Sequence, residues 1–245
     1  MSTVAVRTLI PNVLTICTYG GFAPVCYRDK FGVLTGFDVG FLTRFADSIG
    51  LKIMTLERPF DALWLRPGND ECDIAGAGIM QRVNRPIGEG ASWTRPYFRV
   101  KRTLLVRLED QPRFEAEGAL RGEGMRIVAT QGSTADYDAQ IRYPNRKALL
   151  YLADLSSLIN DPGQSQREIV RLIAEREVDA FGEGDVSNEF LRDSYNRQFR
   201  GVELAVADKH DIDEQETFNF IVRNVSDGLL DALNSYIGKH ANAYA

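Results

Sequence analysis

The sequence predicts an α/β fold, and two observations lead to that class. Short apolar runs with strand character alternate along the chain with segments whose apolar residues recur at helical spacing. Glycine turns join several of these segments, as happens where a strand leads into a helix. With 245 residues, of which 44% are apolar and 26% charged, the chain has the composition of a globular protein. Its length suits one large domain or two small lobes.

The first hundred residues contain three expected strands and two expected helices. The strand Val13–Thr18 comes first, and the helix 38–49 follows a glycine turn. Asp38 is expected to cap that helix at its start, and Gly50 to end it. The apolar face of this helix consists of Val39, Leu42, Ala46 and Ile49. The other expected elements are a strand at 52–56, a short helix at 60–65 and a strand at 73–78.

The rest of the chain continues the alternation. The expected strands are 101–108, 126–130, 147–152, 178–181, 202–207 and 217–222. The expected helices are one that follows the turn at 131–134, then 164–175, 186–195 and a last one that starts near residue 226. Three residues of the helix 164–175 face inward: Ile169, Leu172 and Ile173. The last helix buries Leu229, Leu230, Leu233, Tyr236 and Ile237.

The strand 101–108 is suited to crossing between two lobes, and the charged loop 208–216 is suited to the return. We therefore expect a discontinuous lobe 1 made of 1–99 and 217–245, and a continuous lobe 2 made of 104–212. The hinge segments are then 100–103 and 213–216.

Composition argues against several classes of function. The net charge is −5, and acidic and basic residues are mixed throughout, so we expect no nucleic-acid partner. No apolar stretch is long enough for membrane insertion. The two histidines, His210 and His240, lie far apart, and the three cysteines form no CxxC or zinc spacing, so no metal and no cofactor are expected. Cys17, Cys26 and Cys72 are interpreted as small buried apolar residues.

The N-terminal residues 1–7 lack the charged-then-apolar pattern of a secretory signal. The protein is therefore expected to be periplasmic or extracellular if a signal peptide has been removed, and cytoplasmic otherwise.

Four groups of short motifs occur in a fixed order along the chain. They are Phe22-Ala23-Pro24 through Tyr27 with Gly36-Phe37-Asp38-Val39, Asp73-Ile74-Ala75 through Arg85 with Pro96-Tyr97-Phe98, Val128-Ala129-Thr130-Gln131-Gly132-Ser133-Thr134, and Val178-Asp179-Ala180 with the acidic loop after it. In this order they resemble the type II periplasmic solute-binding proteins of family 3, the polar amino-acid group that serves ABC importers. The resemblance covers about residues 13–237. It implies a two-lobe fold of the Venus-flytrap kind, in which each lobe is a mixed sheet flanked by helices. It also implies a monomer with an ABC permease as partner.

Arg85 lies twelve residues after Asp73, where this family carries an arginine that grips a ligand carboxylate. A guanidinium presents a rigid fork of donors that matches a carboxylate. The alternative is a surface or ion-paired arginine.

The turn formed by Gln131, Gly132, Ser133 and Thr134 precedes a helix, whose first N–H groups attract anions. The resemblance implies that this turn is the second clamp on the same carboxylate. Ordinary helix capping by Ser133 or Thr134 is the alternative and can coexist with ligand binding.

Aromatic residues are expected to form the walls of the ligand site. Phe22 and Phe60 fall where the family sandwiches a ligand side chain, and Tyr19 and Tyr27 lie beside the first of them in sequence. The same residues could instead belong to the core, which is also the expectation for Trp64 and Trp93. Gly78 and Met80 lie in the loop that leads to Arg85 and also belong to the expected ligand-binding set.

Two departures from the family pattern concern the ammonium group of an amino acid. The family uses a hydroxyl two residues after the loop glycine, but Gly78 is followed by Ile79 and Met80. It also uses a carboxylate five residues after the aspartate of the Val-Asp-Ala motif, where this chain has Gly184. The neighbouring Glu183 and Asp185 could replace it. If neither reaches the ligand, the ligand is not a standard α-amino acid, because a buried ammonium without acceptors is costly.

The leading hypothesis is therefore a solute-binding protein that closes two lobes on a small carboxylate-bearing ligand, with no catalytic residue. The second hypothesis is a carbon–oxygen lyase on the same fold, similar to cyclohexadienyl or arogenate dehydratases, with Glu183 or Asp185 as general acid. The third is a ligand-sensing domain.

Overall fold

The computed structural model describes residues 6–83, 85–155, 157–158, 165–211, 216–224 and 228–241. The chain divides into two compact units, each of which has its own internal contacts. Unit 1 consists of Met1–Arg99 and Thr217–Ala245, and unit 2 consists of Val100–Glu216. The expected start of the last helix near residue 226, and residues 213–215 of the second expected hinge segment, lie outside the described residues.

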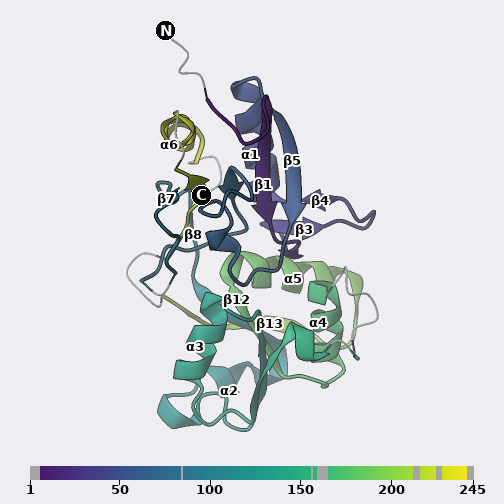
Figure 1. Cartoon of the computed structure of the whole chain (residues 1–245). Helices are drawn as coiled ribbons and strands as arrows, with labels where there is room; N and C mark the ends of the chain where they lie inside the picture. The colour runs from purple at the N-terminus through teal and green to yellow at the C-terminus, as the bar shows by residue number, and fades with distance from the viewer. Residues whose placement is uncertain are drawn as a thin grey trace. The chain divides into compact units, whose positions relative to one another are not determined.

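Unit 1 is built on a five-stranded mixed sheet in the order β5-β1-β6-β15-β7. Its elements are β1 (Val13–Thr18), β2 (Gly21–Phe22), β3 (Cys26–Arg28), β4 (Leu34–Thr35), α1 (Phe37–Ser48), β5 (Lys52–Glu57), β6 (Ile74–Ala75), β7 (Ala91–Trp93), β8 (Phe98–Arg99), β14 (Thr217–Phe218), β15 (Ile221–Arg223) and α6 (Leu229–His240). β1 runs parallel to β5 and β6, whereas β15 is antiparallel to β6 and β7. The helix α1 lies alongside β1 and β5 (Figure 1).

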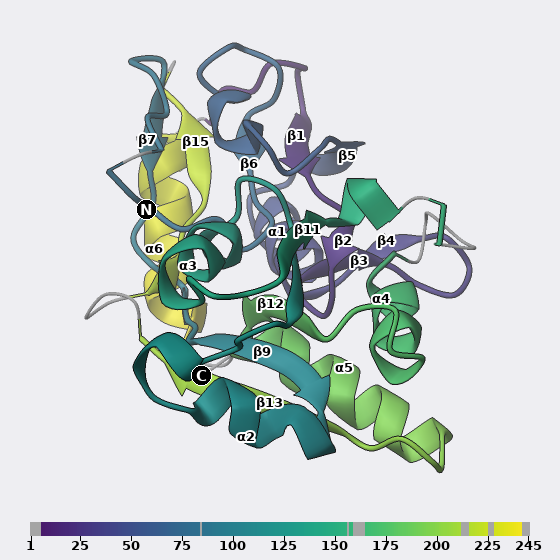
Figure 2. The ribbon, with the colours of Figure 1, turned by 90° about the horizontal axis from the view of Figure 1, so that it is seen from below.

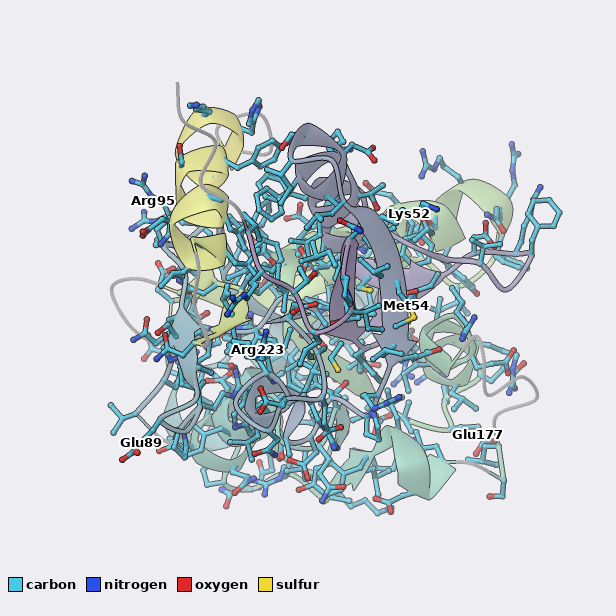
Figure 3. All side chains as sticks on the ribbon, turned by 45° about the horizontal axis from the view of Figure 1, so that its top comes forward. Lys52, Met54, Glu89, Arg95, Glu177 and Arg223 are labelled. Atoms are coloured by element: carbon cyan, nitrogen blue, oxygen red, sulfur yellow. The ribbon has the colours of Figure 1, made fainter. Side chains whose placement is uncertain are left out.

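The core of unit 1 joins the sheet to α1 and α6. Its buried members include Leu14, Ile16, Phe41, Leu42, Phe45, Ile74, Phe220, Leu229, Leu233 and Ile237. β5 is the edge strand of the sheet, and Lys52 and Met54 lie exposed on it (Figure 3). A charged side chain on such an edge discourages pairing with another chain.

The start of α1 differs from the prediction. The N-cap is Gly36 with φ 123°, and Asp38 lies buried in the first turn instead of capping the helix. The expected end is confirmed, because Gly50 follows Ile49 with φ +73°. The buried face also includes Phe41 and Phe45, which the predicted face omitted.

Several short elements differ from the sequence expectation. The expected helix 60–65 is a 3-10 turn over Leu63–Leu65, and the expected strand 73–78 is ordered as a strand only over Ile74–Ala75. The expected strand 217–222 divides into β14 and β15. Strands of two or three residues carry too little apolar periodicity to be recognised from sequence.

Unit 2 is built on a second five-stranded mixed sheet, in the order β11-β10-β12-β9-β13. Its elements are β9 (Arg102–Arg107), α2 (Gln111–Glu115), β10 (Arg126–Ala129), α3 (Thr134–Arg142), β11 (Ala148–Tyr151), α4 (Ser165–Ala174), β12 (Ala180–Gly184), α5 (Asp185–Gln198) and β13 (Leu204–His210), with 3-10 turns at Leu108–Asp110, Gly118–Leu120 and Leu152–Leu155. One apolar cluster packs α3 on the sheet, and a second cluster packs α4 and α5 on it. Figure 2 shows α5 running alongside β9 and β13.

The three cysteines lie in unit 1 and are fully buried as free thiols. Cys17, Cys26 and Cys72 pack in one apolar cluster with Leu63 and Ala75. Their interpretation as small buried apolar residues is therefore confirmed.

A buried aspartate stands at the start of an inner strand in each unit. In unit 1, Asp73 precedes β6, donates its N–H to the Thr15 carbonyl and accepts the Thr15 N–H on Oδ2 at 2.9 Å. In unit 2, Asp179 precedes β12, donates to the Arg126 carbonyl and accepts the Arg126 N–H on Oδ2 at 2.8 Å. Each aspartate thus fixes the start of its own strand against the parallel neighbour.

Asp179 is also held by two guanidinium groups. Arg107 donates to its Oδ1 at 2.9 Å, and Arg126 Nε donates to its Oδ2 at 2.9 Å. Burial acts to raise the pKa of Asp179, but the hydrogen bonds from Arg126 and Arg107 outweigh it and lower the pKa to about 2.

We predict that Asp179→Asn lowers the free energy of unfolding at pH 7 by about 3 kcal/mol, because it removes a charged acceptor that the buried Arg107 shares with Arg126. The folded pKa lies below the ordinary value of about 3.9, so this contribution is present above pH 4 and is lost as the pH falls towards 2. Urea unfolding between pH 2.5 and pH 7 measures both effects. Asp193→Asn is the matched control, since its Arg192 pair is exposed and should change stability by less than about 1 kcal/mol. Equal losses in the two variants would contradict the prediction.

Candidate functional site

The guanidinium of Arg85 is packed against two aromatic rings in unit 1. Its Cζ lies 4.9 Å from the ring centroid of Trp64 and 5.5 Å from that of Phe60. The residue is 5% exposed, and Nη1 donates to the Met80 carbonyl at 3.3 Å. Rings on the faces of a guanidinium stabilise its charge and restrict its orientation while its donors stay in the plane. Arg85 is therefore a buried, oriented group and not a surface arginine.

The loop that leads to Arg85 is fixed by a glycine. Gly78 has φ +63°, and a Cβ built on it would lie 2.4 Å from the ring of Phe22. Glycine is therefore required here both for its backbone conformation and for the close approach of the ring. The Gly78 N–H donates to Asp38 Oδ2 at 2.8 Å, and Met80 forms a β-bridge with Phe218.

Asp38 is the buried anchor of this loop, a role that the sequence reasoning missed. Tyr97 donates to its Oδ1 at 2.6 Å. Burial raises the pKa of Asp38 to about 7, although the hydrogen bonds from Tyr97 and Gly78 act to lower it. The signal available in the sequence was the pairing of the Gly-Phe-Asp and Pro-Tyr-Phe motifs, but sequence alone does not show that they meet.

The four expected wall residues occupy different environments. Tyr19 and Phe60 meet edge to face with centroids 5.8 Å apart, so Tyr19 joins the cluster that holds Arg85. Phe22 is 5% exposed and packs its edge on Phe218 at 5.7 Å. Tyr27 lies half-buried on β3.

In unit 2, the turn before α3 is closed by the protein's own side chains. Ser133 is the N-cap, and its Oγ accepts the Asp136 N–H at 3.1 Å. Asp136 reaches back and accepts the Gly132 N–H on Oδ2 at 3.0 Å. This reciprocal arrangement is close to a capping box, so capping by Ser133 is confirmed. A carboxylate of the chain thus occupies the Gly132 donor that was expected to meet a ligand.

Hydroxyl groups at the end of β10 add further donors. Ser133 and Thr134 are 8% and 5% exposed, whereas Gln131 is exposed. Thr130 is 9% exposed, and among the described residues its buried Oγ1 has no hydrogen-bond partner. In the sequence, Thr130 is only one member of a motif. Its role could not be predicted there, because the role depends on exposure and hydrogen bonding.

Glu183 and Asp185 are placed in contrasting surroundings. Glu183 is 7% exposed at the end of β12, where Arg102 Nη1 lies 3.6 Å from its Oε1 and the Gly184 N–H donates to the same oxygen at 3.0 Å. Asp185 begins α5, accepts the N–H groups of Lys101 and Val186, and lies 3.0 Å from Lys209 Nζ. Asp185 is committed to the start of the helix, and Glu183 is the buried acid.

Among the described residues, no group of three or more histidine, cysteine, aspartate and glutamate side chains has the arrangement of a metal site. In the same part of the chain, every helix falls short of the length or apolar character that a membrane span requires.

The family model of the bacterial extracellular solute-binding proteins, family 3, matches residues 14–243. The resemblance carried by the four groups of motifs is therefore confirmed.

Two curated relatives show how broad the similarity is. Cyclohexadienyl dehydratase from Pseudomonas aeruginosa is 27% identical over 145 residues, which cover 59% of this chain and 53% of that protein. Membrane-bound lytic murein transglycosylase F from Yersinia pestis is 27% identical over 222 residues, which cover 86% of this chain and 39% of that protein. The chain thus spans about half, or less, of the length of these relatives.

Two solved structures show the fold. An amino acid ABC transporter substrate-binding protein from Streptococcus pneumoniae, bound to L-arginine, has a TM-score of 0.74 at 18% identity and covers 95% of this chain and 90% of its own. An ancestral amino acid-binding protein, described as a precursor of cyclohexadienyl dehydratase, has a TM-score of 0.73 at 16% identity and covers 94% and 90%. The expected α/β fold of the periplasmic-binding-protein type, with mixed sheets flanked by helices, is confirmed.

We predict that Asp38 makes the protein less stable as the pH rises through the acidic range. Its folded pKa of about 7 lies above the ordinary value, so between about pH 4 and pH 7 the folded state holds a proton that the unfolded state releases. Asp38→Asn removes this titration. The free energy of unfolding of the variant, relative to the parent, should therefore increase by up to about 1.4 kcal/mol per pH unit across that window.

Urea unfolding at four pH values from 4.5 to 7.5 measures this difference. Asp47→Asn, at an exposed position of the same helix, is the control and should run parallel to the parent. A parallel profile for Asp38→Asn would show that the carboxyl is already ionised in the folded protein at pH 4.5.

Proposed function

Because the chain belongs to the bacterial extracellular solute-binding proteins of family 3, we propose that it binds a small carboxylate-bearing solute, an amino acid or a close analogue, and delivers it to an ABC importer. The proposed location is periplasmic or extracellular, as the family description implies. The amino acid ABC transporter substrate-binding protein that shares the fold supports this choice of solute and partner.

The observation that carries the proposal is the setting of Arg85. The protein buries a guanidinium, places it over the rings of Phe60 and Trp64, and fixes its loop through Gly78. A buried guanidinium that is held in a fixed orientation offers an anion charge-assisted hydrogen bonds of defined geometry. A ligand carboxylate supplies the two oxygens that such a fork of donors matches.

We place the second contact on the hydroxyl groups before α3. The Gly132 N–H is taken by Asp136, but Ser133 accepts a hydrogen bond and keeps its own proton to donate. The buried Thr130 hydroxyl is a further donor at the same end of β10. These groups and the start of α3 suit a carboxylate oxygen, since a helix N-terminus favours negative charge.

Arg85 belongs to unit 1 and Ser133 to unit 2, so one ligand would need contacts from both units. We propose a hinge closure in which segments 100–103 and 213–216 change conformation and the ligand stabilises the closed form. For an ammonium group, Glu183 is the proposed acceptor, because Asp185 already holds the start of α5 and Lys209.

The first test is a thermal-shift screen against the standard amino acids, their 2-oxo analogues and small dicarboxylates, followed by calorimetric titration of each compound that shifts the melting temperature. A ligand at 100 times its Kd raises the free energy of unfolding by about 2.7 kcal/mol. Mass spectrometry of the denatured protein identifies any solute that was retained during purification. The absence of binding across the screen and of a retained solute would contradict the proposed function.

We predict that Arg85→Gln weakens binding of the ligand found by about 2–5 kcal/mol, because it removes one partner of a buried charged pair. This corresponds to an increase in Kd of about 30-fold or more. Arg95→Gln is the control, because Arg95 is exposed beside α6 (Figure 3). Its Kd should stay within about twofold of the parent value. Similar losses of affinity in both variants would show that Arg85 does not bind the ligand.

A second candidate function is the elimination catalysed by cyclohexadienyl dehydratases. It is favoured by the similarity to the Pseudomonas aeruginosa enzyme and by the buried position of Glu183. As a protonated acid, Glu183 would donate a proton to the leaving hydroxyl of prephenate, while the ring loses carbon dioxide and water and yields phenylpyruvate.

We predict for this candidate that incubation with prephenate produces phenylpyruvate, detected by its ultraviolet absorbance, and that Glu183→Gln abolishes the turnover. Glu189→Gln, an exposed glutamate on α5, is the control and should keep the parent rate. Stoichiometric binding of prephenate without product would reject the dehydratase hypothesis and would be consistent with a solute-binding protein.

A further inference from the structure

Two buried arginines stand at the two ends of β9, and they differ in their hydrogen bonding. Both are 2% exposed. Arg107, at the C-terminal end, uses all three of its nitrogen atoms. Its donors reach Asp110 at 2.6 Å, the carbonyls of Ile173 and Val178 at 2.6 and 3.0 Å, and Asp179 at 2.9 Å. Arg107 is therefore fixed in one arrangement.

Arg102, at the N-terminal end of β9, is incompletely bonded. Its Nε donates to Glu216 Oε2 at 3.1 Å, whereas Nη1 lies 3.6 Å from Glu183 Oε1, beyond a good hydrogen bond. Its Nη2 is buried and, within the part of the chain that the structure describes, has no hydrogen-bond partner. A buried donor without an acceptor is costly, so the guanidinium is stabilised if it moves to a position where this donor meets one.

The two acids beside Arg102 belong to different parts of unit 2. Glu183 is the penultimate residue of β12 and the proposed ligand acid. Glu216 is the last residue of unit 2 before the chain returns to unit 1. It is 4% exposed, although it ends the charged segment 208–216 that the sequence predicted as a loop.

The two crossing segments run side by side as an antiparallel pair. Arg99 pairs with Thr217, and the Val100 N–H donates to the Glu216 carbonyl at 3.0 Å. Arg102 follows two residues later and contacts the Glu216 side chain. One guanidinium therefore lies between the proposed ligand acid and the paired crossing segments.

We propose that Arg102 is a positioning residue that divides its guanidinium between Glu183 and Glu216, and so couples the charge state at Glu183 to the hydrogen bonding of the crossing segments. When a cationic group of a solute approaches Glu183, it competes with Arg102 for that carboxylate. The guanidinium then moves towards Glu216 and strengthens the pairing of the crossing segments. The bistable element is the side chain of Arg102, whose incomplete bonding leaves both arrangements open to it.

The ligand side of this inference rests on the proposed function, whereas its test requires no ligand. The readout is hydrogen exchange of the Val100 amide, resolved by NMR in the full chain without added solute. Glu183→Gln removes the competing charge, so Arg102 should pair more fully with Glu216. The exchange of Val100 should then slow by about threefold or more. Glu189→Gln removes the same charge from an exposed position of unit 2 and should leave the exchange unchanged.

The coupling is tested by repeating the comparison without the bridging group. In an Arg102→Met background, Glu183→Gln should no longer change the exchange of Val100. If Arg102→Met does not fold, as judged by circular dichroism, Arg102→Lys takes its place, because an ammonium cannot span two carboxylates as a guanidinium does. In that background, Glu183→Gln should change the logarithm of the Val100 exchange rate by less than half as much as it does when Arg102 is present.

Two results would overturn the proposal: Glu183→Gln behaves like Glu189→Gln, or its effect persists at full size without Arg102. The exchange experiment contains no solute, so a negative result would reject the coupling without bearing on the proposed solute binding. Likewise, a negative result in the solute-binding screen would not change the outcome of the exchange experiment.

Discussion

Both units depend on a backbone exchange between an aspartate and the neighbouring parallel strand. Asp73 and Asp179 each donate their N–H to a carbonyl of that strand and accept its N–H on the carboxylate. The partners, Thr15 and Arg126, precede the paired residues of β1–β6 and β10–β12 at the same offset. The two exchanges set the register of these parallel pairs, and the register determines where the strands end.

The candidate residues of each unit lie just beyond those ends. The loop with Tyr19 and Phe22 follows β1, and the loop with Gly78 and Arg85 follows β6. In unit 2, the turn that begins at Thr130 follows β10, and Glu183 lies at the end of β12. In open α/β sheets, ligands bind outside the carboxyl ends of the strands, where loops from neighbouring strands converge. A structural aspartate at one end of a strand therefore helps to position the candidate site residues at the other end.

The long elements could be predicted from the sequence because apolar periodicity is a local pattern, whereas the candidate site residues came from the resemblance to a family. Apolar periodicity identified α1, and the family resemblance pointed to Arg85, which the structure places beside two aromatic rings. The missing parts depend on contacts between distant residues. Asp38 looks like a helix cap in sequence, yet its carboxylate holds Gly78, forty residues away. The sequence did not indicate a role for Arg102, because its partner Glu216 lies 114 residues further along the chain.

The completeness of hydrogen bonding separates the two buried arginines of β9. A buried guanidinium whose donors all meet acceptors, such as Arg107, already has its lowest-energy surroundings, and any movement would cost hydrogen bonds. At Arg102, one buried nitrogen has no acceptor among the described residues, so movement costs less and a new acceptor gains more. Burial alone does not distinguish the two residues, since their exposure is the same. The difference lies in the number of satisfied donors, and it is this difference that supports the proposed role of Arg102.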